Sequence, residues 1–505
     1  MAPMKITPLA PHSSHGAARR WLIVLSTAAI LAGCASTAVP SDSLQIKAPP
    51  QWYAPLPHNG SLASLSQWWQ QQNDPLLVEL IEAAQAVSPS IVTARSNIEQ
   101  ARASRANSEA ALLPTLDAAS SFNRGVTAPI NRIAAVPVNV GDLGLQASWE
   151  IDIFGQNSAS LDADRERYEG AQARWHDARV SVAAEVAGQY YTLRACDKLR
   201  LGAEADAHSR AETARLSALV TQAGFEAPAT AALARASAAE AQARAKQQRA
   251  QCALNLKSLV LMTAWSEPLL RQKLEIALAQ APLVESPESL FNVTGIPAEV
   301  LAQRPDVFNA AREVAAASLE VGSARAQRYP RLSLAGNIMS NKSRARRITQ
   351  GFDTWSVGPL ALTVPLFDGG ASDANLDAAK ARYEDAASKY RSTCRQAVRE
   401  VEEALVNLES TGDRSGNTVQ AAEGYQASFA GTQARYKAGL ASLVDLEDSR
   451  RTLLASQSAL INLELERRSA WIALYRALGG GWTTATPHST PMVFEIPESA
   501  LPVWR

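Results

Sequence analysis

The stretch "RYKAGLASLVDLEDSRR", Arg435–Arg451, interrupts a long, alanine-rich and charged helical pattern at Gly439. The pattern resumes at once and carries two acids, Asp445 and Asp448, just past the interruption. Because glycine readily adopts backbone angles that end a helix, the stretch predicts a helical hairpin that turns at this position. A second Ala-Gly pair, in "LVTQAGFEAPATAALARAS", predicts a matching turn at Gly224.

The two halves of the chain match each other when they are laid together at an offset of 215 residues. The matched pairs are Leu161 and Leu376, Tyr168 and Tyr383, Trp175 and Tyr390, Leu193 and Leu408, Gly224 and Gly439, and Leu259 and Leu474. Such a series over about 180 residues predicts an internal duplication. Each copy is expected to run helix, strand, strand, long helix, turn, helix.

In each copy a helix is expected to end at a proline, Pro114 or Pro330, and two alternating runs of apolar and polar residues follow it. These runs are near ten residues long, which is the length of a tilted membrane strand. The expected strands are about 115–124 and 142–153 in the first copy and about 331–339 and 356–366 in the second.

The links between paired strands, roughly 125–140 and 340–355, are polar or contain proline and are expected to be exposed loops. Long helices are then expected over 156–222 and 370–436, each ~100 Å long. Apolar positions recur every seven residues in the second of them, which predicts a coiled-coil seam. This helix is expected to continue through "STGDRSGN", 410–417, because the first copy has no break there.

Four membrane strands cannot close a barrel by themselves. Unpaired backbone groups in lipid cost several kcal/mol each, and single-chain barrels begin at about eight strands. A barrel would therefore be shared between chains, with eight strands from a dimer or twelve from a trimer. The strand count does not choose between these two assemblies.

The N-terminus has the features of a secretory signal. Three basic residues precede a 13-residue apolar run, Trp21 to Gly33, which is shorter than the roughly 20 residues of a spanning helix. The run ends in "LAGC", which resembles the signal of bacterial lipoproteins, in which the cysteine, here Cys34, becomes the lipidated first residue. The residue after the cysteine is Ala35 and not aspartate, which resembles the signal that sorts lipoproteins of the enteric type to the outer membrane. An ordinary signal peptide with an incidental cysteine is the alternative.

No catalytic, metal-binding or nucleic-acid-binding pattern is evident. Basic and acidic residues are equal at 49 each, so no basic excess points to nucleic acid. The six histidines are scattered, and neither H-E-x-x-H nor CxxC occurs. The sequence predicts no enzyme activity, no metal and no cofactor beyond the covalent lipid on Cys34.

Three cysteines remain besides Cys34. Cys196 and Cys252 lie 28 residues before and after Gly224, so an antiparallel hairpin would hold them at a similar height. A disulfide is possible in the oxidising periplasm. A pair of small buried thiols is the commoner arrangement at such positions, and the sequence does not decide between the two. Cys394 lies on the heptad seam and is expected to be plain core.

An ordered set of motifs resembles the TolC-like outer-membrane factors of tripartite efflux pumps, and within them the lipoprotein (NodT-type) branch. The motifs are Leu31–Cys34, Trp68-Trp69 followed by Asp74-Pro75, Arg304–Asp306, Pro365–Gly370, Tyr436–Leu446 and Tyr475–Trp482. The resemblance implies a mainly α fold with a small antiparallel β part. It also implies a homotrimer with a twelve-stranded barrel in the outer membrane, a periplasmic coiled-coil tunnel and an equatorial belt.

On this basis the chain is divided into six segments. They are a signal peptide (1–33), an N-terminal lipid anchor and equatorial segment (34–89), repeat 1 (90–263), a linker or equatorial segment (264–300), repeat 2 (301–478) and a C-terminal equatorial segment (479–505).

The implied function is a passive outer-membrane duct that exports drugs or other small solutes. The implied partners are a periplasmic adaptor protein, an inner-membrane efflux transporter and outer-membrane lipid. A non-conducting structural envelope lipoprotein is the alternative, against which the paired strands argue. A periplasmic adaptor is less consistent, because adaptors have one hairpin and a lipoyl-like domain.

The resemblance also implies site residues. Residues matching Tyr436, Asp445 and Asp448 narrow the pore in the family, which implies a gate at the periplasmic aperture. The alternative is that acids early in a helix contribute about 0.3–1 kcal/mol through its dipole.

Two departures from some relatives bear on how this gate is held closed. Ala441 and Ser442 lack the basic residue that some relatives carry in this turn, and Thr230 stands where some relatives have an acid. The contacts that close the gate are therefore expected to be weaker or differently arranged.

The hairpin tips are candidates for adaptor docking, because exposed apolar residues at such places usually mark a partner. The candidate residues are Gly224, Phe225, Gly439, Leu440 and Leu443. The alternative is that they pack on the neighbouring hairpin.

Overall fold

A computed structural model describes residues 53, 68–72, 74–126, 137–280, 297–346 and 348–482. The expected signal peptide (1–33), the lipidation site Cys34 and the C-terminal residues from 483 onward lie outside these ranges. The described chain forms two compact units: residues 104–165 with 315–385, and the remaining described residues. We call them the sheet unit and the helical unit.

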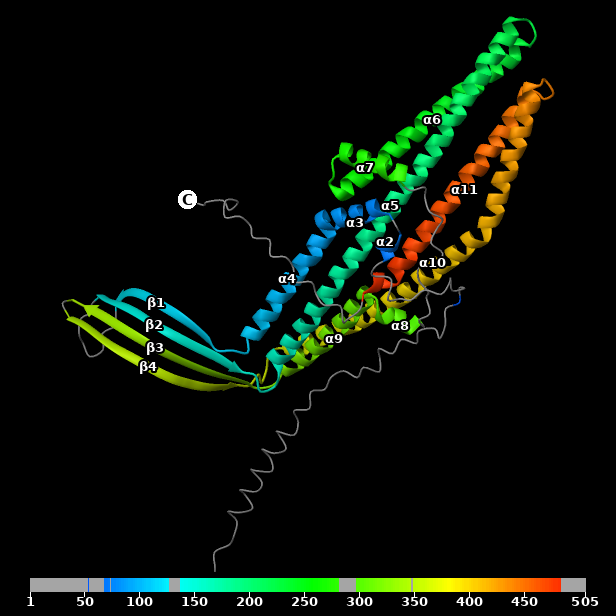
Figure 1. The fold of residues 1–505 in the computed structure, drawn as a ribbon. Coiled ribbons are helices and arrows are strands. Elements are labelled where there is room, and N and C mark those ends of the chain that lie inside the picture. Colours follow the sequence, from blue (N-terminus) through cyan, green and yellow to red (C-terminus); the bar gives the residue numbers. More distant parts are fainter. Residues whose placement is uncertain are drawn as a thin grey trace, which may run out of the picture. The chain divides into compact units, whose positions relative to one another are not determined.

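The order of elements confirms the expected duplication (Figure 1). The first copy comprises α4 (Pro89–Ala110), β1 (Thr115–Val126), β2 (Pro137–Ile151), α5 (Gln156–Gln222) and α6 (Pro228–Thr263). The second comprises α9 (Pro305–Ala326), β3 (Arg331–Ala345), β4 (Ile348–Thr363), α10 (Ala371–Lys437) and α11 (Leu443–Ala477). The remaining described elements are α2 (Trp68–Gln71), α3 (Pro75–Val87), α7 (Glu267–Gln280), α8 (Pro297–Ala302) and a 3-10 turn, η3 (Gly479–Gly481).

The four strands form one antiparallel sheet in the order β1-β2-β3-β4. The expected exposed loop at 340–355 is wrong, because β3 continues to Ala345 and β4 begins at Ile348. Polar pairs such as Ser343 with Gln350 extend the ladder, since its backbone hydrogen bonds need no apolar side chain. In the same way β2 begins at Pro137, earlier than expected.

The second strand of each copy, β2 or β4, ends slightly earlier than expected, and both ends have the same cause. The Asp152 carboxylate accepts hydrogen bonds from the backbone of Asn157 (3.2 Å) and Ser158 (2.7 Å) at the start of α5. Asp368 does the same for Gly370 and Ser372 at the start of α10, at 2.9 Å each. These capping bonds bring each chain segment out of the sheet and into its long helix.

The sheet has one apolar and one polar face. Register places Ala118, Leu145, Ile338 and Trp355 side by side in one row, and Asp117, Gln146, Asn337 and Ser356 in the next. Within the chain the apolar row is uncovered: Ile338 is 64% and Trp355 77% exposed. Such an exposed apolar surface requires a partner or a lipid environment.

The long helices match their expected bounds to within one residue. The helix α10 runs unbroken through 410–417, as expected. The residues that suggested a break have packing roles instead: Thr411 is fully buried and its hydroxyl donates to the Asn407 carbonyl at 2.8 Å. A Cβ at position 412 would lie 3.0 Å from Arg467 of α11, so glycine permits this close approach.

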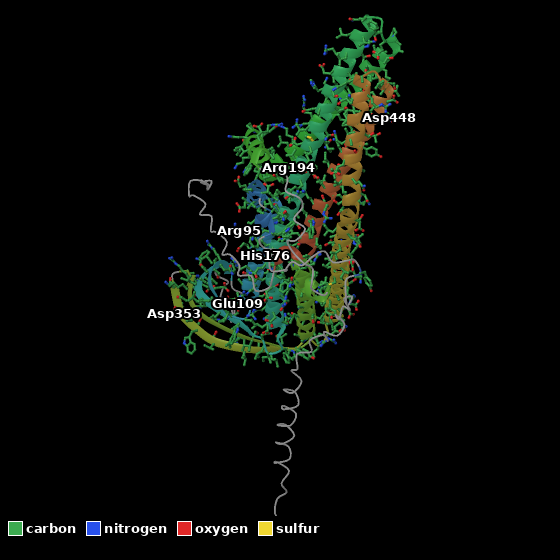
Figure 2. The ribbon with its side chains drawn as sticks, turned by 45° about the vertical axis from the view of Figure 1, so that its right-hand side comes forward. Arg95, Glu109, His176, Arg194, Asp353 and Asp448 are labelled. Carbon is green, nitrogen blue, oxygen red and sulfur yellow. A yellow bond between two sulfur atoms is a disulfide. The ribbon has the colours of Figure 1, made fainter. Side chains whose placement is uncertain are left out.

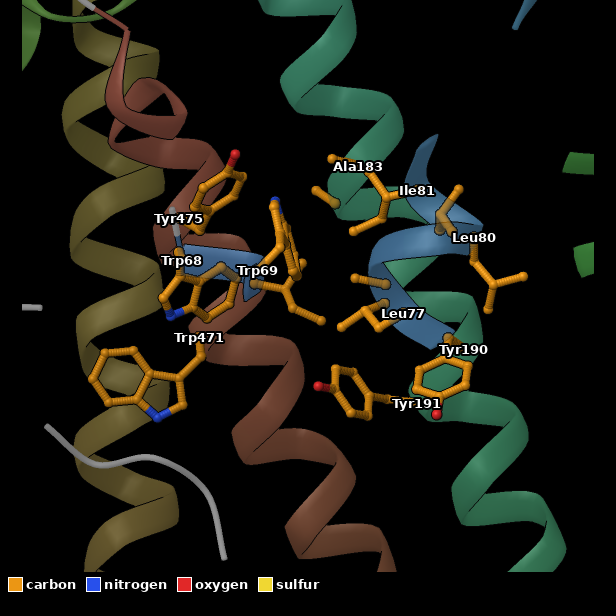
Figure 3. Close-up of a cluster of buried hydrophobic side chains, with 14 of the residues drawn as sticks. Trp68, Trp69, Leu77, Leu80, Ile81, Ala183, Tyr190, Tyr191, Trp471 and Tyr475 are labelled. Atoms are coloured by element: carbon orange, nitrogen blue, oxygen red, sulfur yellow. The ribbon is translucent and has the colours of Figure 1, made fainter. Parts of the chain in front are cut away.

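The main core of the helical unit contains the two tryptophans of α2, beside α3, α5 and α11 (Figure 3). Trp68 stacks on Tyr475 with ring centroids 5.0 Å apart, and Trp69 meets the same ring edge-on at 4.8 Å. Both tryptophans are therefore packing anchors of this core. Such aromatic contacts contribute about 0.5–1.5 kcal/mol each beyond the area that they bury.

The "DP" that follows the tryptophans starts α3. Asp74 caps the helix by accepting from the Leu77 backbone N–H at 3.3 Å. Its second oxygen accepts from the Tyr190 hydroxyl at 2.7 Å, and Arg194 donates to that hydroxyl at 2.6 Å. Burial, reinforced by the Asp74 charge, raises the pKa of Tyr190, so this phenol remains a donor.

Among the described residues, no single helix is long and apolar enough to cross a membrane. By length and composition alone, α3 and α4 pass that test together, with a bend of 49° between them.

Cys196 of α5 and Cys252 of α6 form a disulfide, with Cα atoms 5.6 Å apart. The sequence left this question open. Small residues such as Ala203, Ala207, Ala241 and Ala245 pack between the same two helices and allow the close approach that a disulfide requires. Cys394 is a free, buried thiol, as expected.

Without reductant, we expect the unfolded protein to expose one reactive thiol in addition to Cys34, which is that of Cys394. With reductant, we expect three reactive thiols in addition to Cys34. The reason is that only the disulfide hides Cys196 and Cys252 once the chain is unfolded. Mass spectrometry after maleimide labelling counts the thiols, and a Cys252→Ala variant should expose two without reductant. Three labels in unreduced wild type would contradict the disulfide.

Candidate functional site at the hairpin tips

Both hairpin turns depend on a glycine with left-handed backbone angles. Gly224 has φ +83° and Gly439 has φ +75°. At the second turn the Leu440 N–H reaches back to the Arg435 carbonyl at 2.8 Å, and the Gly439 N–H donates to Tyr436 at 2.9 Å. This pair of bonds satisfies carbonyls at the helix end, and the first turn repeats it. The predicted turns are confirmed.

The tips expose some of the apolar candidates and bury another. Phe225 is 85% exposed and Leu440 is 71% exposed. Leu443 is only 4% exposed, because it packs with Leu446 and with three alanines of the other hairpin, Ala214, Ala234 and Ala238. The expectation of an exposed docking side chain at position 443 is therefore wrong, and the alternative of packing on the neighbouring hairpin holds there.

Tyr436 belongs to the same small cluster. It is half-buried, and it packs against the apolar cluster together with Phe429. Burial, with a smaller contribution from the charges of Glu226 and Glu447, raises the pKa of the Tyr436 hydroxyl. The tyrosine therefore contributes apolar contact between the hairpins and stays protonated.

Asp445 starts α11. Its backbone N–H donates to the Ser442 hydroxyl at 3.1 Å, while its carboxylate accepts from the Ser442 backbone N–H at 2.9 Å. These reciprocal bonds form a capping box. Hydrogen bonds from the Ser442 side chain and backbone lower the pKa of Asp445, so the exposed carboxylate is ionised. The helix-start explanation of this acid has direct structural support.

Asp448 lies one turn further along α11, near the turn end of the hairpin (Figure 2). It is exposed and pairs with Arg451 on the same helix. An exposed pair of this kind is worth little to stability, since solvent screens it. Its carboxylate is thus available for other electrostatic roles, and neither acid is drawn into the interior of the hairpin pair.

A buried group of four charges lies next to this apolar cluster, and sequence analysis missed it. Its members are Asp206 and Arg210 of α5 and Glu447 and Arg450 of α11; we call it the tip charge cluster. Their side chains are 3%, 9%, 15% and 3% exposed. In the sequence they are indistinguishable from ordinary charged helix faces, and only the packing of one hairpin on the other reveals their burial.

Among the described residues, no group of three or more metal-ligating side chains could hold a metal ion. The tip instead offers exposed carboxylates, exposed apolar turns and a buried ionic contact between hairpins. The described chain contains two copies of a pair of antiparallel strands, whose sheet has an uncovered apolar face, and each pair is followed by a helical hairpin. These features are those of an outer-membrane channel protein.

Comparison with known proteins agrees. The outer membrane efflux protein family profile matches the chain twice, over residues 80–264 and 296–480. The solvent efflux pump outer membrane protein SrpC of Pseudomonas putida is 29% identical over 423 residues, covering 82% of this chain and 87% of SrpC. The probable outer membrane lipoprotein SilC of Salmonella typhimurium is 26% identical over 477 residues, covering 91% and 98%. The solved outer-membrane channel OprN superposes with a TM-score of 0.72 at 26% identity, covering 87% of this chain and 98% of OprN.

The chain belongs to the outer membrane efflux protein family, and its resemblance to TolC-like factors is confirmed. It is the outer-membrane channel component of an efflux pump, located in the outer membrane, and it is not an enzyme. The double match to the family profile coincides with the two copies seen in the fold.

Proposed function

We propose that the protein is the passive exit duct of a tripartite efflux system and works as a lipid-anchored homotrimer. The observation that carries this proposal is the four-stranded sheet, with an uncovered apolar row and two unpaired edges, β1 and β4. Pairing β4 of one copy with β1 of the next satisfies both edges. Three copies supply twelve strands, a number within the range of closed membrane barrels.

The proposed cargo is drugs or other small solutes. The name of the relative SrpC refers to solvents, which supports export of small apolar compounds. A wide duct offers few contacts to any one solute, so selectivity is assigned to the inner-membrane transporter that the duct serves. The periplasmic adaptor that connects them would contact the exposed tips, at Gly224, Phe225, Gly439 and Leu440.

The lipid anchor is assigned to Cys34, which follows the apolar run and small residues of the "LAGC" motif. Two anchors, a covalent lipid and a sheet inserted in the bilayer, would both hold the protein in the outer membrane. The relative SilC is described as a probable outer membrane lipoprotein, which supports this assignment.

Native mass spectrometry of protein purified in detergent should show three chains, each with one lipid adduct. Cys34→Ser should abolish the adduct and leave the trimer, because strand pairing and not the lipid holds the copies together. A monomer in the wild-type sample would refute the shared sheet, and an unmodified Cys34 would refute the anchor.

The export role and the docking surface are tested together in cells. Deleting the gene should sensitise the strain to a panel of apolar compounds, and the wild-type gene should restore resistance. Phe225→Asp with Leu440→Asp should fail to restore it, because charges at the exposed tips disrupt apolar docking. The control is conductance of the purified variant in planar bilayers, which should equal wild type. No sensitisation on deletion would contradict export of these compounds, and full rescue by the variant would contradict docking.

We further propose that Tyr436, Asp445 and Asp448 form the periplasmic aperture, where three copies would bring six carboxylates together. A ring of this kind attracts cations and repels anions. The variant Asp445→Asn with Asp448→Asn should reduce the cation preference of the channel, because it removes the charge that attracts cations and repels anions. Asparagine keeps an acceptor oxygen for the Ser442 N–H.

Ser442→Ala provides the matched control for this prediction. It breaks the capping box and destabilises the first turn of α11 by about 1 kcal/mol, but it keeps both carboxylates. Reversal potentials in a salt gradient should match wild type for this control and shift toward zero for the double variant. Equal selectivity in all three proteins would remove the aperture proposal.

A further inference from the structure

We propose that the apolar face of the sheet carries, near its strand turns, a site for phosphate-bearing lipids of the outer leaflet. The site consists of three cations, Arg124 of β1 and Lys342 and Arg344 of β3, and we call it the basic band. This inference rests on the proposed function, because it requires that the sheet is inserted in the outer membrane.

Strand register places the three cations on the apolar face. Side chains alternate between the two faces of a strand, so Lys342 and Arg344 lie on the same face as Ile338. Arg124 joins them across β2, because Asn139 pairs with Arg124 on one side and with Arg344 on the other. From the usual strand spacing and rise, the backbone at Arg344 lies about 10 Å from Arg124 and about 7 Å from Lys342. These long side chains can therefore reach one headgroup.

The opposite face of the sheet carries no cation at this level. Among the paired strand residues that the structure describes, the last three rows of the polar face are neutral except for Asp142. These rows are Asn123, Val140, Ser343 and Gln350; Ser121, Asp142, Asn341 and Phe352; and Gly125, Val138, Ala345 and Ile348. A charge that sets ion selectivity would lie on this polar face, which lines the proposed duct. The cations are instead placed toward whatever covers the apolar face.

Protection of an open sheet edge does not explain the cations of β3. Charged residues are common on edge strands, where they prevent pairing with other chains. The strand β3 lies between β2 and β4, and its residues Lys342 and Arg344 are paired on both sides. They have no edge to protect, yet both side chains are exposed, as is Arg124.

The height of the basic band matches the outer boundary of a membrane. The β1–β2 and β3–β4 connections lie at one end of the sheet, and the connections to helices leave from the other, near Thr115, Ile151, Arg331 and Thr363. With the helices on the periplasmic side, as the proposed duct requires, the strand turns face outward. Lys342 is ten residues beyond Leu332, which begins the apolar face on β3. At about 3.4 Å per residue and a tilt of about 40°, this is a height of ~26 Å, close to the ~25 Å apolar band of membrane sheets.

Two aromatic side chains lie on the same face. Phe122 shares a row with Lys342 and is 76% exposed, and Trp355 lies two rows nearer the helices and is 77% exposed. Aromatic residues are typical of the boundary between the apolar band and the headgroups. One acid, Asp353, lies in the row between them (Figure 2). Near the strand turns, the described paired residues of this face thus carry three cations and one anion.

Phosphate is the anion that suits the basic band. Arginine donates two parallel hydrogen bonds to phosphate oxygens, and lysine adds a compact charge. The band follows the exposed apolar rows on the same face, so a lipid whose headgroup reaches it can lay its acyl chains along those rows. A free phosphate gains the charge contacts alone, whereas a phosphate-bearing lipid gains both. The basic band is therefore assigned to lipid headgroups.

Native mass spectrometry of the purified trimer tests the site, with diphosphoryl lipid A as the probe. The triple variant Arg124→Ser, Lys342→Ser and Arg344→Ser should bind it at least ten-fold more weakly. The reason is that one cation beside an anionic headgroup changes affinity on the order of five-fold. The control Arg331→Ser removes a cation from the polar face at the helix end of β3 and should stay within two-fold of wild type. Equal affinity of the triple variant and wild type would overturn the site.

A measurement on wild type alone keeps the test decisive if the triple variant does not form a trimer. Lipid A from which both phosphates have been removed should bind at least ten-fold more weakly than the diphosphoryl form, and millimolar inorganic phosphate should not displace the latter. Equal affinity for the two lipids would overturn the phosphate site, and displacement by inorganic phosphate would overturn its assignment to lipid. A trimer that conducts in planar bilayers but shows no phosphate preference refutes the basic band alone. Wild type that forms no trimer refutes the proposed duct, and the site with it.

Discussion

The structure depends first on the edges of its sheet. Four antiparallel strands leave the outer backbone groups of β1 and β4 unpaired, and one face presents an apolar row with Trp355 77% exposed. In water this face favours aggregation, and in lipid each unpaired backbone group costs several kcal/mol. The open sheet of a single chain is therefore unfavourable both in water and in lipid. Its unpaired edges and exposed apolar face are the physical basis for the proposed trimer. The duplication supplies the two hairpin pairs of strands, and the capping carboxylates Asp152 and Asp368 end them at equivalent places.

The helices follow a different principle, which is close approach through small residues. Alanines between α5 and α6 bring the backbones near enough for the Cys196–Cys252 disulfide, and Gly412 allows Arg467 to approach α10. A helix contact of this kind gains little free energy from buried apolar area, because each alanine side chain is a single methyl group. Specific polar contacts then decide how one hairpin meets the other. The tip charge cluster has that role where α11 crosses to the opposite hairpin, and its desolvation cost makes the contact strong only while all members are in place.

Sequence reasoning was most successful where a physical signal repeats. The two copies check each other, so the bounds of α5 were found, and α10 was followed through "STGDRSGN" against the local turn signal. Strand ends were less predictable, because polar residues such as Ser343 and Gln350 pair through backbone groups that carry no sequence signal. The tip charge cluster and the burial of Leu443 were missed for another reason. Heptad spacing shows which residues face a neighbour, but it does not tell which helix that neighbour is.

Asp445 shows why two explanations of one residue need not exclude each other. Its carboxylate completes the capping box with Ser442, which is sufficient reason for an acid at this position. A carboxylate offers about four lone-pair sites, however, and the cap leaves some of them free. The capping bonds lower its pKa, so the group keeps its charge, and it is fully exposed. The interaction that starts α11 thus also fixes an ionised oxygen beside the turn at Gly439. A helix cap can in this way supply a charge to the proposed aperture without any further residue to hold it there.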